Sequence, residues 1–156
     1  MDSIQRITYA TDFSPSSLAA FPHALRLARV TGAEVTILHV LPALTPFVDL
    51  GYVPQQTWSE FDATMRAKAG QEMNHLIRQA VDAGVRTTSY IVGPGLPADE
   101  IVRAVDKAKT DVLVLGTHGR TGVARLLLGS VATRVVATAS CPVLTVRAAE
   151  TAAAAA

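Results

Sequence analysis

Five strand-like runs alternate with four segments of helical spacing along this 156-residue chain. Several of the runs are apolar on consecutive positions, which is typical of strands buried on both faces of a sheet. The alternation predicts an α/β fold, in which helices cover both faces of a parallel sheet. Ligands bind to such sheets in a crevice at the carboxyl ends of the strands, where the strand order reverses. The expected strands are residues 4–10, 34–40, 85–92, 111–115 and 142–146.

The first helix carries signals at both of its ends. Ser14 followed by Pro15 predicts its N-terminus, and Gly32 predicts a left-handed C-terminal cap. Pro22 lies inside the same helix and removes one backbone donor. We therefore expect a kink or a restart near Phe21.

The second helix is preceded by a long connection, residues 41–57, which contains three prolines and is a candidate lid. Thr57 and Glu60 have the spacing of a capping box, so we expect the helix to begin there and to run to Gly84. The two remaining helices are expected after a turn at residues 93–100 and over residues 130–139.

Composition predicts one domain. With 49% hydrophobic and 17% charged residues, a chain of this length fills one core but not two. We expect a single domain at residues 1–147 and an alanine-rich tail at residues 148–156. Uncharged stretches are too short for a membrane helix, and the first residues lack the pattern of a secretory signal. The lone Cys141 has no partner for an internal disulfide, so the expected location is cytoplasmic, without a membrane partner.

Charge is distributed unevenly, although the net charge is only +1. Between Asp111 and Glu150 there is no acidic residue, whereas four arginines fall inside this window. A local surplus of arginine suits a small anionic ligand better than a nucleic acid, which requires a broader basic face. No nucleic-acid partner is therefore expected.

The segment "GTHGRTGVARLLLGS", residues 116–130, begins where the fourth strand ends. Backbone amides at a helix N-terminus bind phosphate when no side chain blocks the approach, and Gly129 followed by Ser130 meets that condition. Gly116 and Gly119 would let the chain turn and bring its own amides near the same anion. The alternative, a tight turn with close helix packing, is equally compatible with the spacing. The segment is not a P-loop, because it has no GxxxxGK[ST] and no lysine.

Two glycines spaced as GxxG, then nine residues and GS, followed by "VATRVVATASCPVLTV", resemble the universal stress protein family. "ITYATDFSPSS", "AEVTILHV" and "DVLVLGTHGR" resemble three of its strands, so the resemblance extends to about Arg147. It implies an open five-stranded parallel sheet of order 3-2-1-4-5, which is Rossmann-like and similar to the adenine nucleotide alpha hydrolases. The complete glycine pattern resembles that of the ATP-binding branch.

The resemblance also implies a set of nucleotide-binding positions. Adenine and ribose would be received by Ala10, Asp12 and Val40, the nucleoside would be flanked by Leu115 and Gly116, and the phosphates would be surrounded by His118, Gly119, Arg120, Gly129, Ser130 and Val131. The implied ligand is ATP, or AMP or ADP. Mg²⁺ would accompany it, bound to phosphate oxygens and water with few protein ligands.

Single residues in this set have simpler interpretations as well. Asp12 could cap the first helix, and Arg120 could merely solvate its loop. No acid in the segment orients His118, so we expect no catalytic residue. No metal site is expected either, since His23, His39 and His75 lack metal-ligand spacing and should be ordinary surface or core residues.

By the resemblance, the function is that of an ATP-dependent regulator or sensor in the stress response, with at most weak ATP hydrolysis. Two alternatives remain open: a slow ATPase or adenylyl or phosphoryl transferase, and an interaction protein that does not use nucleotide. A flavodoxin-like carrier is disfavoured, because its phosphate loop follows the first strand. The last strand, residues 142–146, is apolar and free of blocking charge, which predicts an edge that pairs with a second copy. A homodimer through this strand is also implied by the resemblance.

Overall fold

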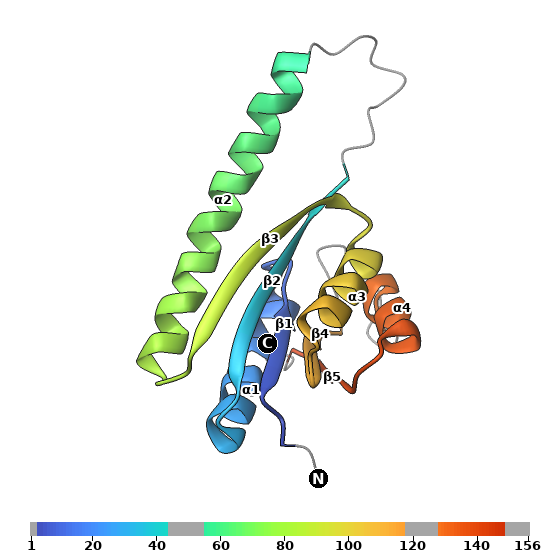
Figure 1. Cartoon of the computed structure of the whole chain (residues 1–156). Helices are drawn as coiled ribbons and strands as arrows, with labels where there is room; N and C mark the ends of the chain where they lie inside the picture. Colours follow the sequence, from blue (N-terminus) through green and yellow to red (C-terminus); the bar gives the residue numbers. More distant parts are fainter. Residues whose placement is uncertain (1–2, 44–54, 118–127, 149–156) are drawn as a thin grey trace, which may run out of the picture.

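The computed structural model describes residues 3–43, 55–117 and 128–148 (Figure 1). Five parallel strands form one sheet in the order β3-β2-β1-β4-β5, which confirms the expected fold class and strand order. The strands are β1 (Arg6–Ala10), β2 (Glu34–Pro42), β3 (Thr87–Gly95), β4 (Val112–Gly116) and β5 (Val143–Val146). The helices are α1 (Pro15–Thr31), α2 (Gln55–Asp82), α3 (Pro97–Ala108) and α4 (Ser130–Thr138).

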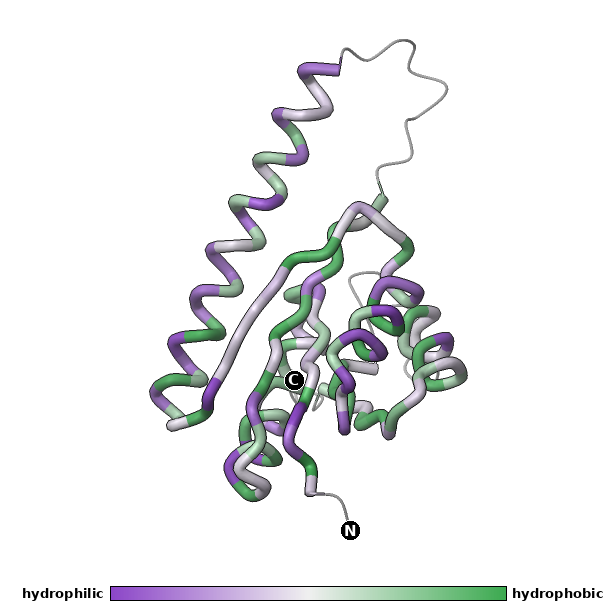
Figure 2. The backbone as a smooth tube through the Cα atoms, in the orientation of Figure 1, coloured by the Kyte–Doolittle hydropathy of each residue, from purple (hydrophilic) through white to green (hydrophobic). Residues whose placement is uncertain are grey.

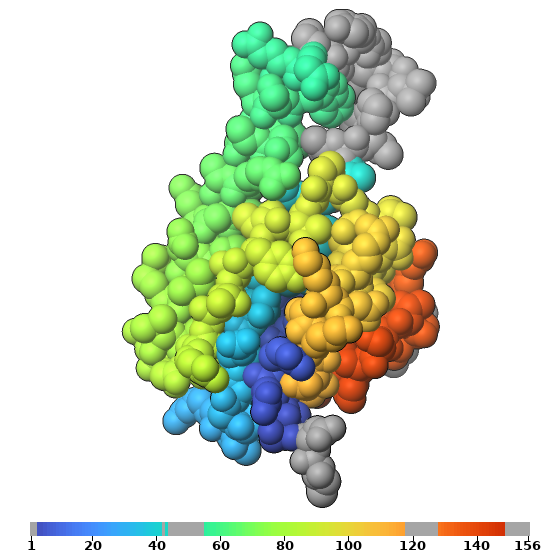
Figure 3. Space-filling model, viewed as in Figure 1, coloured from blue at the N-terminus to red at the C-terminus, as the bar shows by residue number. Residues whose placement is uncertain are grey.

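Helices cover both faces of the sheet, and each face has its own core. Alternate strand residues such as Tyr9 and Ile37 pack with α1 and α2 in one cluster. Their neighbours Ala10 and Leu38 pack with α3 and α4 in the other. The second face is only partly covered, since atoms of β1, β2 and β3 are visible between α2 and α3 in Figure 3. The α3–α4 core therefore lies over the β1–β4 side of the sheet.

The ends of α1 are those that the sequence predicted. The Ser14 hydroxyl accepts a hydrogen bond from the Ser17 amide at 3.2 Å, and Gly32 caps the C-terminus with φ +75°. Of the expected kink or restart near Phe21, the restart is wrong, because α1 is continuous through Pro22, and the kink stays a prediction. Pro22 lies on the exposed side of the helix, so its ring does not have to fit into the core.

The expected start of α2 at a Thr57 cap is also wrong. The helix begins at Gln55, so Thr57 is already helical. Glu60 does not reach back to a cap but pairs with Gln56 one turn earlier, at 3.3 Å between amide nitrogen and carboxylate oxygen. Such pairs at i and i+4 support a helix without a capping box. Most of the candidate lid, residues 44–54, lies outside the described residues.

Only the C-terminal half of α2 is buried against the sheet. Figure 1 shows the N-terminal turns extending beyond the strands, and Figure 2 shows hydrophilic and hydrophobic residues alternating along the helix. The buried side chains of α2 all fall in its second half: Ala69, Met73, Leu76 and Ala80.

Strand β3 continues beyond its expected end. After an irregularity in β2 between Val40 and Pro42, Pro42 pairs with Gly95, and the Ala43 amide donates to the Gly95 carbonyl at 3.2 Å. The turn expected at residues 93–100 is therefore wrong in its first part, and α3 begins at Pro97. Of the expected tail, only Ala148 is described. No helix in the described ranges is both long and apolar enough to cross a membrane.

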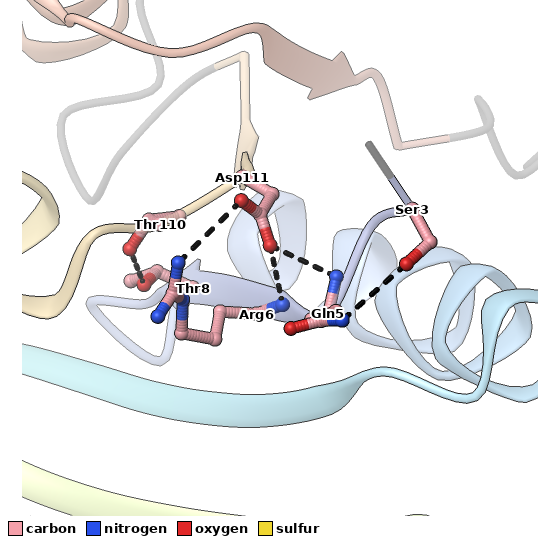
Figure 4. Close-up of polar contacts among 6 residues, drawn as sticks. All are labelled: Ser3, Gln5, Arg6, Thr8, Thr110 and Asp111. Atoms are coloured by element: carbon pink, nitrogen blue, oxygen red, sulfur yellow. Dashed lines mark hydrogen bonds and ion pairs between the residues drawn. The ribbon is translucent and has the colours of Figure 1, made fainter. Parts of the chain in front are cut away.

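The start of β1 is tied to the residues before β4 by polar contacts (Figure 4). The Asp111 carboxylate accepts hydrogen bonds from the backbone amides of Gln5 and Arg6, each at 2.8 Å. Beside them, the hydroxyl oxygens of Thr8 and Thr110 lie 2.7 Å apart. The two backbone hydrogen bonds hold the pKa of Asp111 below its usual value of 3.8, since the charged carboxylate is the better acceptor.

We expect Asp111→Asn to lower the free energy of unfolding by about 1 kcal/mol at neutral pH, because an amide oxygen accepts more weakly than a carboxylate. Since the folded-state pKa is depressed, this contribution is present above 3.8 and is lost as the pH falls through the folded-state pKa. The difference from wild type should shrink accordingly in urea unfolding below pH 3.8. Glu72→Gln, on the exposed side of α2, is the matched control. A difference that does not change on acidification would contradict the assignment.

A second constraint acts where β4 meets α1. A methyl group at Gly116 would lie 2.6 Å from the Ser16 carbonyl oxygen and 2.7 Å from the Ser17 amide nitrogen. These are backbone atoms at the start of a helix, so they cannot give way as a flexible side chain can. Glycine at this position thus permits the end of β4 to approach α1.

Gly116→Ala should therefore destabilise the protein by about 2 kcal/mol, the typical cost of overpacking. Gly70→Ala is the control, because Gly70 lies inside α2 with no atom within 4 Å of an added methyl group. That substitution should raise stability by about 0.5–1 kcal/mol, since alanine is the better helix former. Urea unfolding of both variants measures the contrast, and equal stability of Gly116→Ala and wild type would rule out the close approach.

Candidate functional site

A cavity of about 360 Å³ lies at the carboxyl ends of the central strands. The ends of β1, β2 and β4 form its floor, and the N-terminal turns of α3 and α4 form its walls. Its position matches the crevice expected for this sheet. The strand order reverses between β1 and β4, and the cavity lies at the carboxyl ends of these two strands. A cavity of this size is in the range of small-molecule sites.

The structure brings together most of the residues singled out from the sequence. Those that line the cavity are Ala10, Asp12, Val40, Leu115, Gly116, Gly129, Ser130 and Val131. His118, Gly119 and Arg120 lie outside the described residues, so their positions relative to the cavity stay predictions.

Other cavity residues were not anticipated: Thr11, Ser17, Leu38, His39, Pro97, Ile101, Thr117 and Ala132. Some carried a weak signal, because Thr11, His39 and Thr117 adjoin expected site residues at the ends of strands. Ile101 carried none. It lies in α3 beyond a turn, and only the packing of that helix over the sheet brings it to the cavity.

One side of the cavity is apolar. Ala10, Leu38 and Leu115 come from three adjacent strands and point to the same face of the sheet, where Ile101 of α3 packs with them. Each of these four side chains is buried. A surface of this kind suits a flat, weakly polar group such as a heterocyclic base.

The other side of the cavity is the start of α4. Gly129 is the N-cap with an extended ψ of 158°, no described side chain caps the helix, and its first turn contains no acidic residue. The Gly129 amide donates to the Thr117 carbonyl at 2.7 Å, which fixes the helix start against the end of β4. The first backbone amides of an α-helix have no hydrogen-bond partner within that helix, and they lie at the positive end of the helix dipole. This end of the cavity can therefore bind an anion.

Asp12 does not cap α1, and its role as a ligand contact stays a prediction. Its carboxylate accepts a hydrogen bond from the Ser14 amide at 3.0 Å, as in an Asx turn before α1, and it also lines the cavity. The cap of α1 itself is Ser14. The carboxylate is thus held at the cavity by the turn that starts the helix.

A buried hydroxyl network supports this turn from below. The oxygens of Thr11 and Ser17 lie 3.0 Å apart, and the Tyr9 hydroxyl donates to the Ser17 carbonyl at 2.8 Å. Burial raises the pKa of Tyr9 to about 12, although hydrogen bonds with Thr11 and Ser17 partly oppose the shift. Tyr9 therefore stays a neutral donor at physiological pH. Within the described parts of the chain, no three His, Cys, Asp or Glu side chains are grouped to hold a metal ion.

Comparison with known proteins agrees with the fold. Residues 3–147 match the model of the universal stress protein family. Universal stress protein MJ0531 of Methanocaldococcus jannaschii is 36% identical over 143 residues, which cover 92% of this chain and 82% of that protein. The solved structure of MJ0577 from the same organism has a TM-score of 0.81 at 28% identity and covers 94% of this chain and 97% of that one.

Another solved structure, a universal stress protein in complex with cAMP, has a TM-score of 0.68 at 28% identity. It covers 94% of this chain and 99% of that one. The family match spans nearly the whole chain and includes every described element of the sheet. The chain therefore belongs to the universal stress protein family.

Proposed function

We propose that the cavity binds an adenine nucleotide and that the protein acts as a nucleotide-dependent regulator in the stress response. One observation carries the proposal: a single cavity has an apolar wall on one side and, on the other, the start of α4, which no described side chain caps. A nucleotide has the same two-part chemistry, a flat base and an anionic phosphate. The complex of a 28% identical relative with cAMP supports the assignment.

The ligand is oriented by this division of the cavity. The base lies against Ala10 and Val40, the ribose lies near the Asp12 carboxylate, and the phosphates face Gly129 and Ser130. Carboxylate oxygens accept hydrogen bonds from ribose hydroxyls, while helix amides and the Ser130 hydroxyl donate to phosphate. ATP is the proposed ligand, with AMP and ADP as related ones, and Mg²⁺ would bind through phosphate oxygens and water.

The loop before α4 completes the proposed phosphate site. His118, Gly119 and Arg120 are assigned to it by their place in the glycine pattern alone. The cytoplasmic location expected from the sequence is part of the same proposal.

A regulator accounts for the described residues better than a dedicated enzyme does. Among the described residues that line the cavity, only Asp12 and His39 are ionisable. The Asp12 carboxylate accepts from the Ser14 amide, and the His39 imidazole is within 2.8 Å of the Thr11 carbonyl oxygen. Both side chains thus have structural partners in the turn before α1. A slow ATPase or a transferase remains the alternative, and its mark would be nucleotide turnover in a purified sample.

Ser130→Asp should weaken ATP and AMP binding at least tenfold, because a carboxylate at the start of α4 repels phosphate. The fold should tolerate the change, since an acid in the first turn of a helix is stabilising. Adenosine has no phosphate, so its affinity should change little. Titration calorimetry of nucleotide-free protein with all three ligands measures the contrast.

Two variants serve as controls for this measurement. Ser130→Asn has the shape of the aspartate without its charge and should keep most of the affinity. Thr133→Asp places the same charge on the exposed surface one turn further along α4. Equal losses for adenosine and ATP would place the phosphates elsewhere, and a wild type that binds no nucleotide would overturn the proposed function.

We also propose that the protein forms a homodimer through β5. This strand pairs with β4 alone and is an edge of the sheet. The carbonyls of Pro142 and Val146 accept hydrogen bonds from β4, so alternation directs the backbone groups of Val143 and Thr145 to the open edge. Leu144 is 39% exposed beside this edge. A second copy could satisfy both the backbone groups and the apolar surface.

Thr145→Pro should convert the dimer to a monomer. Proline removes an N–H that faces the open edge, so the pairing of β5 with β4 is retained. Thr145→Ala keeps that N–H and should stay dimeric. Light scattering at micromolar concentration gives the mass of each variant, with circular dichroism as the check on folding. A wild type of monomer mass, or a dimeric proline variant, would rule out this interface.

A further inference from the structure

The turn between β1 and α1 contains a backbone conformation that side chains rarely adopt. Phe13 has a φ of +62°, in the left-handed region that favours glycine. The residue before it is Asp12, the carboxylate at the cavity. Strained residues of this kind persist only where the surroundings hold them in place. The contacts of Phe13 therefore indicate what fixes the position of Asp12.

Part of the support is local to the turn. The Phe13 amide donates to the Thr11 hydroxyl at 3.0 Å, and the Ser14 amide donates to the Asp12 carboxylate at 3.0 Å. Both bonds span two residues, so they shape the turn without fixing its place over the sheet.

Further support comes from His39, near the end of β2. Its Nδ1 lies 2.8 Å from the Thr11 carbonyl oxygen, and its ring lies over the Phe13 ring with centroids 4.5 Å apart. A carbonyl oxygen only accepts, so Nδ1 carries the proton and donates. The imidazole therefore contacts the residue on each side of Asp12. His39 is 3% exposed, and it too lines the cavity.

We propose that His39 is a positioning residue for ribose recognition. It clamps Thr11 and Phe13 so that the intervening Asp12 carboxylate is held ready for a ribose hydroxyl. The inference rests on the proposed nucleotide site. It adds that the His39 imidazole orients the Asp12 carboxylate of that site. Fixing the turn before the ligand arrives removes an ordering cost from binding, which is how preorganised sites gain affinity.

The alternative role for His39 is that of a buried polar residue that merely satisfies a backbone carbonyl. Two substitutions separate the roles. His39→Asn keeps an N–H close to the place of Nδ1 and loses the ring, whereas His39→Leu keeps apolar bulk and loses the donor. Positioning through the hydrogen bond requires that asparagine rescue what leucine removes.

The first readout needs no nucleotide. Amide hydrogen exchange of the free protein should be at least tenfold faster at Phe13 and Ser14 in His39→Leu, and close to wild type in His39→Asn. The Leu113 amide, which donates to Pro142 across the β4–β5 pair, reports on the rest of the sheet and should not change. Unaltered exchange at Phe13 and Ser14 in the leucine variant would overturn the proposal.

The second readout is the affinity lost when a ribose hydroxyl is removed. Calorimetry with AMP, 2′-deoxy-AMP and 3′-deoxy-AMP should give a loss of about tenfold for at least one deoxy ligand in wild type and in His39→Asn. The loss should fall to less than threefold in His39→Leu. Val40→Ala, which trims the wall of the cavity without touching the turn, should weaken all three ligands equally.

The outcomes separate the two proposals. If wild type binds AMP and shows no loss with either deoxy ligand, or if His39→Leu keeps the full loss, the inference about His39 is wrong and the nucleotide site stands. If wild type binds none of the three nucleotides, the proposed function fails and the ribose assignment fails with it.

Discussion

Strand β1 lies between two parallel neighbours, with α1 and α2 over one face and α3 and α4 over part of the other. Every backbone edge and every side chain at its centre is therefore committed to the core, and Tyr9 has no exposed surface at all. After the strand ends, Thr11 is still buried, and Asp12 is the first polar residue that is partly exposed. At that level β4 also ends, whereas β2 continues to Pro42 and passes beside the cavity with Leu38, His39 and Val40. The cavity and the turn that starts α1 both follow from this burial of β1.

The cavity combines two surfaces that the fold produces for different reasons. Its apolar wall consists of residues of the α3–α4 core that also line the cavity, such as Leu38, Leu115 and Ile101. Its polar end is the start of α4, where no side chain of the described residues provides the cap that would stabilise the helix. Forgoing that stabilisation leaves amides available for a ligand, a common compromise at functional sites. Under the proposed function, a nucleotide phosphate would accept hydrogen bonds from these amides and so take the place of a cap.

Much of this arrangement could be predicted from the sequence. The features that depend on neighbouring residues were predicted best, and those that depend on contacts between distant segments were missed. The ends of α1 were correct because Ser14 and Gly32 act within one turn. The start of α2 was wrong because the Gln56–Glu60 pair replaces the expected capping box. The extension of β3 depends on its pairing with β2, which no local pattern encodes. His39 was expected to be ordinary for a similar reason, since alternation predicts that a strand residue is buried but not which turn it contacts.

The length of α2 has a consequence for how the molecule opens. Its first half has no buried side chain and relies on pairs within the helix, such as Asp62 with Arg66. Its second half is fixed to the sheet by four buried residues. Local stability must therefore rise steeply along one continuous helix, from marginal at Gln55 to that of the core near Ala80. The two halves of α2 should therefore open with different free energies, with the turns near Gln55 opening more readily than the turns packed on the sheet.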